Sequence, residues 1–452
     1  MDAKEESLKV FMLPWLAHGH ISPYLELAKR LAKRKFLVYF CSTPVNLEAI
    51  KPKLSKSYSD SIQLMEVPLE STPELPPHYH TAKGLPPHLM PKLMNAFKMV
   101  APNLESILKT LNPDLLIVDI LLPWMLPLAS SLKIPMVFFT IFGAMAISFM
   151  IYNRTVSNEL PFPEFELHEC WKSKCPYLFK DQAESQSFLE YLDQSSGVIL
   201  IKTSREIEAK YVDFLTSSFT KKVVTTGPLV QQPSSGEDEK QYSDIIEWLD
   251  KKEPLSTVLV SFGSEYYLSK EEMEEIAYGL ESASEVNFIW IVRFPMGQET
   301  EVEAALPEGF IQRAGERGKV VEGWAPQAKI LAHPSTGGHV SHNGWSSIVE
   351  CLMSGVPVIG APMQLDGPIV ARLVEEIGVG LEIKRDEEGR ITRGEVADAI
   401  KTVAVGKTGE DFRRKAKKIS SILKMKDEEE VDTLAMELVR LCQMKRGQES
   451  QD

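Results

Sequence analysis

The sequence predicts an α/β protein with two domains, each built on a parallel sheet. Three observations favour this class. Short apolar runs typical of buried strands alternate with amphipathic helical segments. The alternation stops at a polar, acidic, turn-rich stretch and then begins again. The chain has 452 residues, which is too long for one typical core.

These observations set the expected boundaries. An N-terminal domain covers residues 1–230, and a linker follows at 231–244, where the sequence reads QQPSSGEDEKQYSD. A C-terminal domain covers residues 245–435, and residues 436–452 form the end of a helix and a tail. Each sheet should be parallel, with right-handed crossovers.

In the N-terminal half, apolar runs bounded by turn residues predict strands, and longer amphipathic stretches predict helices. The expected strands are residues 10–14, 36–41, 114–119, 135–140 and 197–203. The expected helices run from the turn at 17–20 through Leu31 and over 93–111. The proline- and histidine-rich run at 74–88 is predicted to be an irregular surface loop.

The same signals recur after the predicted linker. The expected strands are residues 257–262, 287–293, 336–341 and 355–360. A helix is expected at 270–282, and another begins after residue 347 and stops at Gly355. Residues 401–442 read mostly as charged amphipathic helix.

Composition and charge exclude several classes of protein. The 44% hydrophobic and 25% charged residues are ordinary for a soluble globular protein. A net charge of −13 argues against nucleic acid or an anionic membrane as a partner. The five cysteines are few and scattered, which favours reduced thiols and a cytoplasmic protein. We also expect a monomer.

Nothing in the sequence indicates a metal site or a membrane anchor. Cys170 and Cys175 could begin a metal site, but no second Cys/His pair completes it, so we expect no metal. Charged residues at 2–6 run directly into the first strand, so no signal peptide is expected. The apolar segment at 134–152 is interrupted by proline and glycine, and it reads as a strand, a turn and a helix rather than a membrane span.

The stretch from Trp324 to Gly367 combines two strand-to-helix crossings that would suit a phosphorylated ligand. The strand at 336–341 ends in a turn with small hydroxyl residues and a glycine, and a helix follows. The N-terminus of a helix presents unpaired N–H groups and a positive dipole end, which favour an anion. The next strand ends shortly before Asp366, at the sheet edge where ligands of α/β proteins bind. No G-x-G-x-x-G follows a strand, which argues against a nicotinamide oxidoreductase.

His20 and Asp119 are candidates for acid–base chemistry. His20 lies in the turn after the first strand, and Asp119 ends another strand of the same predicted sheet, so their side chains should meet at one edge. An ordinary histidine pKa near 6.5 suits proton abstraction at neutral pH, and a carboxylate would fix its tautomer. Taken alone, such a histidine is more often a helix cap or a surface residue.

Two motifs resemble those of plant family 1 UDP-glycosyltransferases. One is the 44-residue stretch Trp324–Gly367, with a W-A-P-Q start, H-x-G-W-x-S-x-x-E in the middle and an acidic residue near its end. The other is Gly19-His20-Ile21-Ser22-Pro23, which matches the catalytic turn of the family. The likeness extends over nearly the whole chain.

The resemblance implies a GT-B fold, in which two Rossmann-like domains face each other across a cleft. The N-terminal domain would bind the acceptor, and the C-terminal domain would bind a UDP-sugar as co-substrate. His20 would be the base and Asp119 its partner, while His18 would be non-catalytic. Transfer would be a single inverting displacement without a metal, whereas a retaining glycosidase would need two close carboxylates that nothing in the sequence nominates.

The resemblance also implies a set of donor-binding positions in the C-terminal domain. These are Ser264, Trp324, Ala325, Gln327, His342, Gly344, Trp345, Ser346, Ser347, Glu350, Asp366 and Gly367. Trp324 would stack on uracil and the Ala325 backbone would pair with it, while Gln327 and Glu350 would lie at the ribose. His342 would meet the β-phosphate.

The remaining donor roles concern the phosphates and the sugar. Ser264 and Ser347 would contact the phosphates, and Trp345 and Asp366 would face the transferred sugar. Taken singly, Ser264 is more often a helix N-cap and Trp324 an ordinary packed aromatic. The full set favours the donor site.

Four positions depart from the usual family pattern. Asn343 stands where cysteine is usual, Ser346 where asparagine is usual, and His339 where an aromatic residue is usual. Gly367 stands where the family usually has glutamine or histidine. A nucleotide-sugar-binding relative that has lost catalysis is therefore an alternative, although the presence of both His20 and Asp119 argues for an enzyme.

The acceptor and donor are predicted from smaller features. The segments at 40–47 and 75–78 resemble those of the branch that extends a sugar on flavonoid or terpenoid glycosides, which predicts a hydrophobic glycoside acceptor. A glycine at position 367 removes a side chain that binds sugar hydroxyls in glucose users. Apolar bulk after the strand ending at Thr140 would fill the space of the glucose hydroxymethyl group. These features favour a UDP-pentose such as UDP-apiose or UDP-xylose, with UDP-glucose as the alternative. The positions assigned to sugar selectivity are Thr140, Ile141, Phe142 and Leu365.

Overall fold

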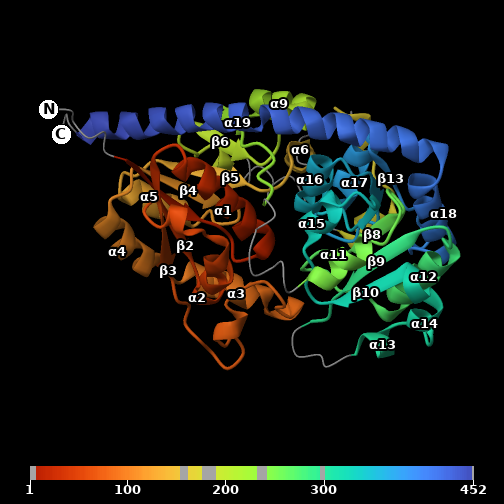
Figure 1. Ribbon diagram of the computed structural model, residues 1–452. Coiled ribbons are helices and arrows are strands. Elements are labelled where there is room, and N and C mark those ends of the chain that lie inside the picture. The colour runs from red at the N-terminus through yellow and green to blue at the C-terminus, as the bar shows by residue number, and fades with distance from the viewer. Residues whose placement is uncertain (1–6, 153–160, 176–189, 232–241, 296–300, 450–452) are drawn as a thin grey trace. The chain divides into compact units, whose positions relative to one another are not determined.

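The computed structural model describes residues 7–152, 161–175, 190–231, 242–295 and 301–449 (Figure 1). The chain forms two compact units. The first comprises residues 1–144, 186–231 and 426–452, and the second comprises residues 145–185 and 232–425. Each unit contains one parallel sheet, which confirms the predicted α/β class.

The first unit contains a seven-stranded sheet with the order β3-β2-β1-β4-β5-β6-β7, and all its pairs are parallel. Its strands are β1 Leu8–Leu13, β2 Phe36–Ser42, β3 Ile62–Glu66, β4 Leu115–Asp119, β5 Met136–Thr140, β6 Val198–Ile201 and β7 Lys222–Thr225. Its helices are α1 His18–Ala32, α2 Pro44–Ile50, α3 Met90–Lys98, α4 Ala101–Leu111, α5 Met125–Ser131 and α9 Arg205–Ser218. Short 3₁₀ turns lie at Lys51–Lys53, Lys56–Tyr58, Pro77–Tyr79 and Pro87–Leu89.

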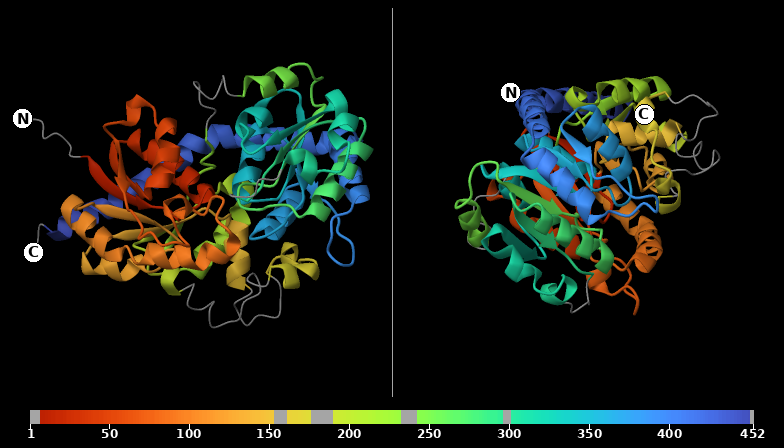
Figure 2. Two further views of the ribbon diagram at one scale, coloured as in Figure 1. Left: turned by 90° about the horizontal axis from the view of Figure 1, so that it is seen from below. Right: turned by 90° about the vertical axis from the view of Figure 1, so that its right-hand side faces the viewer.

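The second unit contains a six-stranded sheet with the order β10-β9-β8-β11-β12-β13, again with parallel pairs. Its strands are β8 Thr257–Ser261, β9 Asn287–Val292, β10 Gly318–Glu322, β11 Thr336–Ser341, β12 Val358–Gly360 and β13 Gly380–Glu382. Its helices are α7 Cys170–Lys174, α11 Ser243–Leu249, α12 Lys270–Ser282, α13 Val302–Ala305, α14 Phe310–Ala314, α15 Gln327–Ala332, α16 Trp345–Ser354, α17 Gly367–Glu376 and α18 Arg393–Ala404. Helices lie on both faces of this sheet (Figure 2).

Two helices join residues of both units. These are α6, Ala144–Tyr152, and the long C-terminal helix α19, Lys407–Glu449. The predicted helix at 401–442 is thus two helices, because α18 ends before Val405 and Gly406 interrupts the pattern.

The helix predicted at 93–111 is likewise divided into α3 and α4. Pro102 stands in the first turn of α4 and cannot donate the hydrogen bond that would continue α3.

The compact units differ from the expected domain boundaries at two places. Residues 145–185, expected in the N-terminal domain, belong to the second unit. There the guanidinium of Arg385 lies 4.8 Å from the ring centre of Trp171, and Lys174 donates a hydrogen bond to the carbonyl of Gly389 at 2.5 Å. The C-terminal residues from 426 belong to the first unit. Most of the predicted linker lies outside the described residues.

The last part of α19 packs into the core of the first unit. Leu434, Leu438 and Leu441 are buried among residues of β1, α1 and β6. Near its end, the guanidinium of Arg446 donates to both oxygens of Asp114 at 2.7 and 2.9 Å. Figure 1 shows this helix in blue.

Candidate active site

His20 and Asp119 meet at the carboxyl edge of the first sheet. His20 lies in the first turn of α1, which follows β1, and Asp119 is the last residue of the neighbouring strand β4. The Nδ1 atom of His20 lies 2.7 Å from Oδ2 of Asp119. The backbone amides of Trp15 and Leu121 donate to Oδ2 and Oδ1 of Asp119 at 3.1 and 3.0 Å. The carboxylate is fully buried and held in one orientation.

This geometry selects one tautomer of His20. A carboxylate at Nδ1 places the proton there, so Nε2 carries the lone pair that can accept a proton. The imidazolium formed by proton uptake would be stabilised by the adjacent carboxylate. His18 lies in the same turn, but its Nε2 atom is 3.4 Å from Nζ of Lys53, whereas Asp119 bonds to His20. The arrangement therefore suits His20 as a general base.

Phe142, two residues after the end of β5, lies beside His20. The rings of His20 and Phe142 are 6.1 Å apart in an edge-to-face arrangement. Ile141 is 8% exposed and belongs to the hydrophobic core, and Thr140 is also buried, with its hydroxyl accepting from the Phe142 amide at 3.2 Å. Of the selectivity residues predicted here, Phe142 is thus the one in ring contact with His20. Burial and the charge of Asp119 raise the pKa of Tyr24, so its phenol stays protonated.

In the second unit, Gln327 connects residues from three elements. Its side-chain oxygen accepts from the Ser261 hydroxyl at 2.9 Å, and its nitrogen donates to the Glu350 carboxylate at 2.8 Å and to the Ser347 hydroxyl at 3.3 Å. Ser261 ends β8, whereas Ser347 and Glu350 lie on α16. Three positions assigned to ribose and phosphate therefore form one hydrogen-bonded cluster with Ser261, which the sequence analysis had not singled out.

His342 follows β11 and is enclosed by two glycines. A Cβ atom on Gly263 would lie 2.6 Å from the imidazole ring, and a Cβ on Gly344 would lie 2.5 Å from its Nε2 atom. Gly263 also has a φ of +77°, a conformation that few residues other than glycine adopt. Burial and the charge of Arg293 lower the pKa of His342 to about 4, so the ring is neutral at physiological pH.

The N-terminus of α16 lies directly after His342 and Asn343. Asn343 has a φ of +61°, which asparagine tolerates better than most residues, and neither polar atom of its side chain has a hydrogen-bond partner among the described residues. Gly344 precedes the helix, and Ser346 and Ser347 stand in its first turn. Trp345 is buried, at 2% exposure. The helix end offers N–H groups and a positive dipole end to an anion.

Trp324 and Ala325 lie in the loop between β10 and α15. Trp324 is 41% exposed, and the guanidinium of Arg293 lies 5.4 Å from its ring centre. Ala325 is buried. An exposed indole backed by a cation suits stacking of a flat base on its outer face.

The loop after β12 brings the last predicted donor positions to the start of α17. Leu365 is 45% exposed and has a φ of +54°, which is unusual for a bulky residue and marks strain. Asp366 is the N-cap and Gly367 the first residue of α17. A Cβ on Gly367 would lie 2.9 Å from the carbonyl oxygen of His342. Any side chain at position 367 therefore needs a shift of this backbone.

The predicted donor residues all belong to the second unit, whereas the predicted catalytic pair belongs to the first. Two residues that hold the donor loops do not belong to the motif and were not predicted. Arg293 bonds the backbone of Gly263 and Gly323, and Gln364 donates to the carbonyl of Glu265 at 3.2 Å. Arg293 could have been suspected, because a cation ending a parallel strand lies at the ligand edge of the sheet.

Comparison with known proteins identifies the family of this chain. A model described as "Glycosyltransferase, N-terminal domain" matches residues 6–231. A model described as "UDP-glucoronosyl and UDP-glucosyl transferase" matches residues 243–437. The chain belongs to the UDP-glycosyltransferase family. It is therefore an enzyme of the UDP-glycosyltransferase kind, as the resemblance of its motifs predicted.

Relatives of this family match over nearly their full length. Mogroside IIIx synthase of Siraitia grosvenorii is 55% identical over 98% of this chain and 96% of the relative. Beta-D-glucosyl crocetin beta-1,6-glucosyltransferase of Gardenia jasminoides is 48% identical over 95% of this chain and 98% of the relative. UGT73P12 of Glycyrrhiza uralensis, solved with glycyrrhetinic acid 3-O-monoglucuronide, matches with a TM-score of 0.86 at 22% identity over 98% of both chains. The last likeness supports the GT-B fold.

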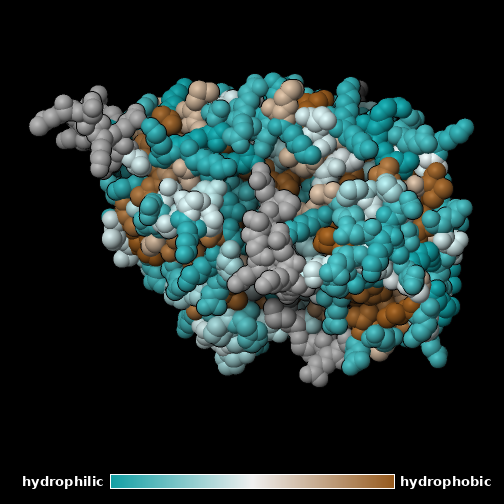
Figure 3. Space-filling view, viewed as in Figure 1, coloured by the Kyte–Doolittle hydropathy of each residue, from teal (hydrophilic) through white to brown (hydrophobic). Residues whose placement is uncertain are grey.

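The surface and the distribution of ligand-type residues complete the description of this UDP-glycosyltransferase. Within the described parts of the chain, no helix is both long and apolar enough to cross a membrane. On the face shown in Figure 3, hydrophobic residues are scattered among hydrophilic ones. The described residues contain no group of three or more His, Cys, Asp or Glu side chains that could hold a metal ion.

Proposed function

We propose that this UDP-glycosyltransferase transfers a sugar from a UDP-sugar, with inversion, to a hydroxyl on the sugar of a terpenoid or flavonoid glycoside. The observation that carries the proposal is the 2.7 Å contact between His20 and Asp119. This pair is a histidine base with its tautomer set by a buried carboxylate. A relative without catalysis would have no need to keep such a pair.

The reaction would proceed as one displacement. Nε2 of His20 takes the proton of the acceptor hydroxyl while the oxygen attacks the anomeric carbon, and Asp119 stabilises the imidazolium. The bond to the β-phosphate breaks, and UDP leaves with the electron pair. Charge then grows on the diphosphate, where neutral His342 and the N-terminus of α16 can donate hydrogen bonds.

The acceptor class rests on sequence features and on the relatives. The Gardenia relative is named for adding a β-1,6-linked glucose to glucosyl crocetin, and this means that it extends a sugar already present. The Siraitia relative is named as a mogroside synthase. The segments at 40–47 and 75–78 of this chain favour the same sugar-extending branch.

For the donor, we propose a UDP-pentose such as UDP-apiose or UDP-xylose. Two observations support it. The ring of Phe142 lies 6.1 Å from that of His20, and the family resemblance implies that residues after this strand lie near the hydroxymethyl group of glucose. Gly367 has no side chain that could bind sugar hydroxyls. A Cβ atom added to it would lie only 2.9 Å from the carbonyl oxygen of His342. A buried hydroxyl without a partner costs roughly 1–3 kcal/mol, which is about tenfold or more in discrimination. The exposed Leu365 would add apolar surface near the sugar.

A donor competition tests both parts of the proposal. A panel of flavonoid and terpenoid aglycones and their glucosides is incubated with UDP-glucose, UDP-xylose or UDP-apiose, and products are identified by mass spectrometry. We expect a second sugar on the glucosides, little product from the aglycones, and a higher kcat/KM for a UDP-pentose. A higher kcat/KM for UDP-glucose would reject the pentose, and transfer to aglycones alone would reject the glycoside acceptor.

We also propose that catalysis needs no metal. The arrangement that supports this is the neutral His342 beside a helix N-terminus, which can stabilise the leaving diphosphate without a cation. Activity should then be unchanged after dialysis against EDTA. A loss that Mg²⁺ restores would contradict this.

A cytoplasmic, monomeric enzyme completes the proposal. The free cysteines Cys41, Cys175, Cys351 and Cys442 are buried as thiols, as in a reducing compartment. Cell fractionation and size-exclusion chromatography with light scattering test the two statements. Recovery with membranes or a dimer mass would contradict them.

A further inference from the structure

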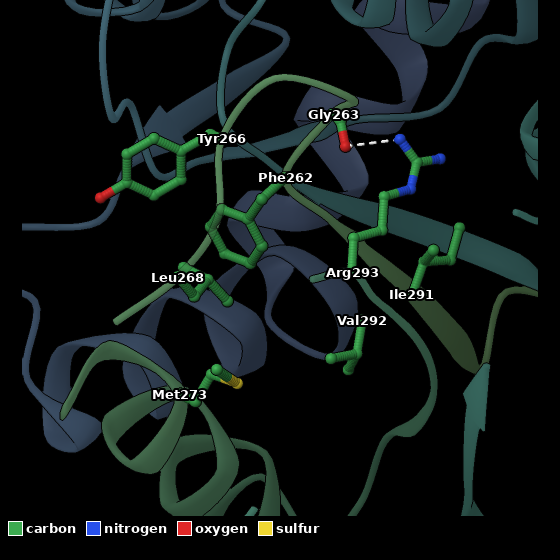
Figure 4. A pocket seen from close by; sticks show the side chains of 8 residues that line it. All are labelled: Phe262, Gly263, Tyr266, Leu268, Met273, Ile291, Val292 and Arg293. Carbon is green, nitrogen blue, oxygen red and sulfur yellow. Dashed lines mark hydrogen bonds between the residues drawn. The ribbon is translucent and has the colours of Figure 1, made fainter. Parts of the chain in front are cut away.

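Arg293 connects the two loops that carry the predicted uracil and phosphate contacts. It follows directly after β9, and its Nε atom donates to the carbonyl of Gly323 at 2.8 Å. Its Nη1 atom donates to the carbonyl of Gly263 at 2.6 Å (Figure 4). Gly323 immediately precedes Trp324, and Gly263 immediately precedes Ser264. One planar guanidinium therefore fixes the backbone next to both positions.

The charge of Arg293 has no acidic partner within the described parts of the chain. None of the ion pairs among those residues involves it, and burial lowers its pKa. A cation that is partly buried without a carboxylate is costly, unless polar groups or an anion compensate it. The two carbonyls provide part of this compensation. An anionic ligand at the same edge of the sheet would provide more.

Two predicted donor residues respond to this charge. The guanidinium lies 5.4 Å from the ring centre of Trp324, in cation–π contact. The same charge helps to lower the pKa of His342 to about 4. Arg293 thus acts on the stacking ring and on the imidazole, although it was not among the residues predicted from the motif.

We propose that Arg293 is a positioning residue for the nucleotide: its guanidinium holds the backbone just before Trp324 and the backbone just before Ser264 in a fixed position relative to each other. The proposal rests on the donor-site assignment above. Loss of the guanidinium should loosen the base site and the phosphate site together, because one side chain holds both loops.

Two substitutions separate geometry from charge. Arg293→Lys keeps the charge, but a single ammonium cannot present the same fork to two carbonyls. Arg293→Gln removes the charge. Calorimetry on the full chain measures the Kd of UDP and of uridine, and NMR follows the titration of His342. We expect Arg293→Lys to weaken both ligands about tenfold or more, since two loop contacts are disturbed. The pKa of His342 should rise in Arg293→Gln and stay low in Arg293→Lys.

Arg317 offers a matched control in the same unit. Its guanidinium also donates to backbone carbonyls, at Leu280, Ala283 and Val286, and lies 5.4 Å from the ring centre of Phe288. Arg317→Lys should lower Tm without changing the Kd of UDP. Equal weakening of UDP by both lysine variants would show a merely structural role and overturn the proposal.

The remaining outcomes are also decisive. Wild-type affinity for UDP and uridine in Arg293→Lys would overturn the role of Arg293 while leaving the donor site intact. If the wild-type chain itself bound no UDP, the donor-site assignment would fail instead. If Arg293→Gln did not fold, the comparison of Arg293→Lys with Arg317→Lys would still decide the question.

Discussion

The hydrogen bond between His20 and Asp119 leads to the first prediction. His20→Ala should lower kcat/KM by about 10²–10⁴-fold, the usual loss of a general base. The Kd of UDP should stay near the wild-type value, since the predicted nucleotide contacts lie in the other unit. Asp119→Asn should give a smaller but still large loss, because an amide can hold the other tautomer. His18→Ala is the matched control and should retain activity. Full activity of His20→Ala would place the base elsewhere.

A second residue-scale prediction concerns the glycine beside His342. Gly263→Ala would place a Cβ 2.6 Å from the imidazole and force a φ of +77° on alanine. His342 would have to move, so we expect weaker UDP binding and slower transfer. Gly315 also has a positive φ, +54°, but a Cβ added there would meet no atom within 4 Å, so Gly315→Ala controls for backbone strain alone. Equal Kd values for UDP in the two variants would show that the contact with His342 is unimportant.

At the residue scale, the sequence predicted that His20 and Asp119 meet, but it did not predict the side-chain hydrogen bonds that hold the candidate site together. His20 and Asp119 could be placed together because both follow parallel strands, whose carboxyl ends share one edge. Gln327 is predicted to lie at the ribose, and its amide also joins Ser261 to α16. Hydrogen bonds of this kind join side chains that are far apart in the sequence. No regular spacing of residues predicts them.

At the scale of helices and strands, some elements were predicted from the sequence and others were not. The sequence predicted the central strands of both sheets, because most strands covered on both faces form continuous apolar runs. The buried strand β11, which reads TGGHVS, is an exception. Each of the four strands that it missed lies at a sheet edge, namely β3, β7, β10 and β13. These edge strands are short and partly exposed, so their sequences lack such a run.

The packing of β11 against α16 gives a prediction on pH and stability. His339 is fully buried, its Nδ1 lies 3.0 Å from Sγ of Cys351, and its Nε2 has no partner among the described residues. Burial lowers the pKa of His339 to about 3, against about 6.5 when unfolded. Below pH 6.5, His339 is therefore protonated in the unfolded chain but stays neutral in the folded chain. The free energy of unfolding consequently decreases as the pH falls toward 3.

His339→Phe should remove this contribution to acid sensitivity. The free energy of unfolding is measured in urea at pH 7.5 and at pH 5. Its decrease between these two pH values should be about 2 kcal/mol smaller in the variant than in the wild type. This figure follows from 1.36 kcal/mol per pH unit over the interval from about pH 6.5 to pH 5. His88 is exposed, so His88→Gln serves as the control that replaces a histidine outside the core. The same pH dependence in His339→Phe and wild type would exclude His339 as a source.

For the whole molecule, the feature that the sequence did not predict is the position of the C-terminal end of α19. A charged amphipathic pattern predicted the helix, but periodicity does not say which core a terminal helix joins. Its last residues belong to the first unit, where Arg446 meets Asp114 and Arg30 meets Asp427. The hydrophobic core of the first unit therefore includes residues from the C-terminal helix of the chain.

This leads to a prediction about the apolar face of α19. Leu438 is fully buried in the core of the first unit, whereas Met436, two residues earlier, is 65% exposed. Leu438→Ala should lower the free energy of unfolding by about 2–5 kcal/mol, because it leaves a cavity. Met436→Ala should change it by less than about 0.5 kcal/mol. Urea unfolding followed by circular dichroism gives both values. Equal, small effects would mean that the C-terminal segment does not contribute to the core of the first unit in solution.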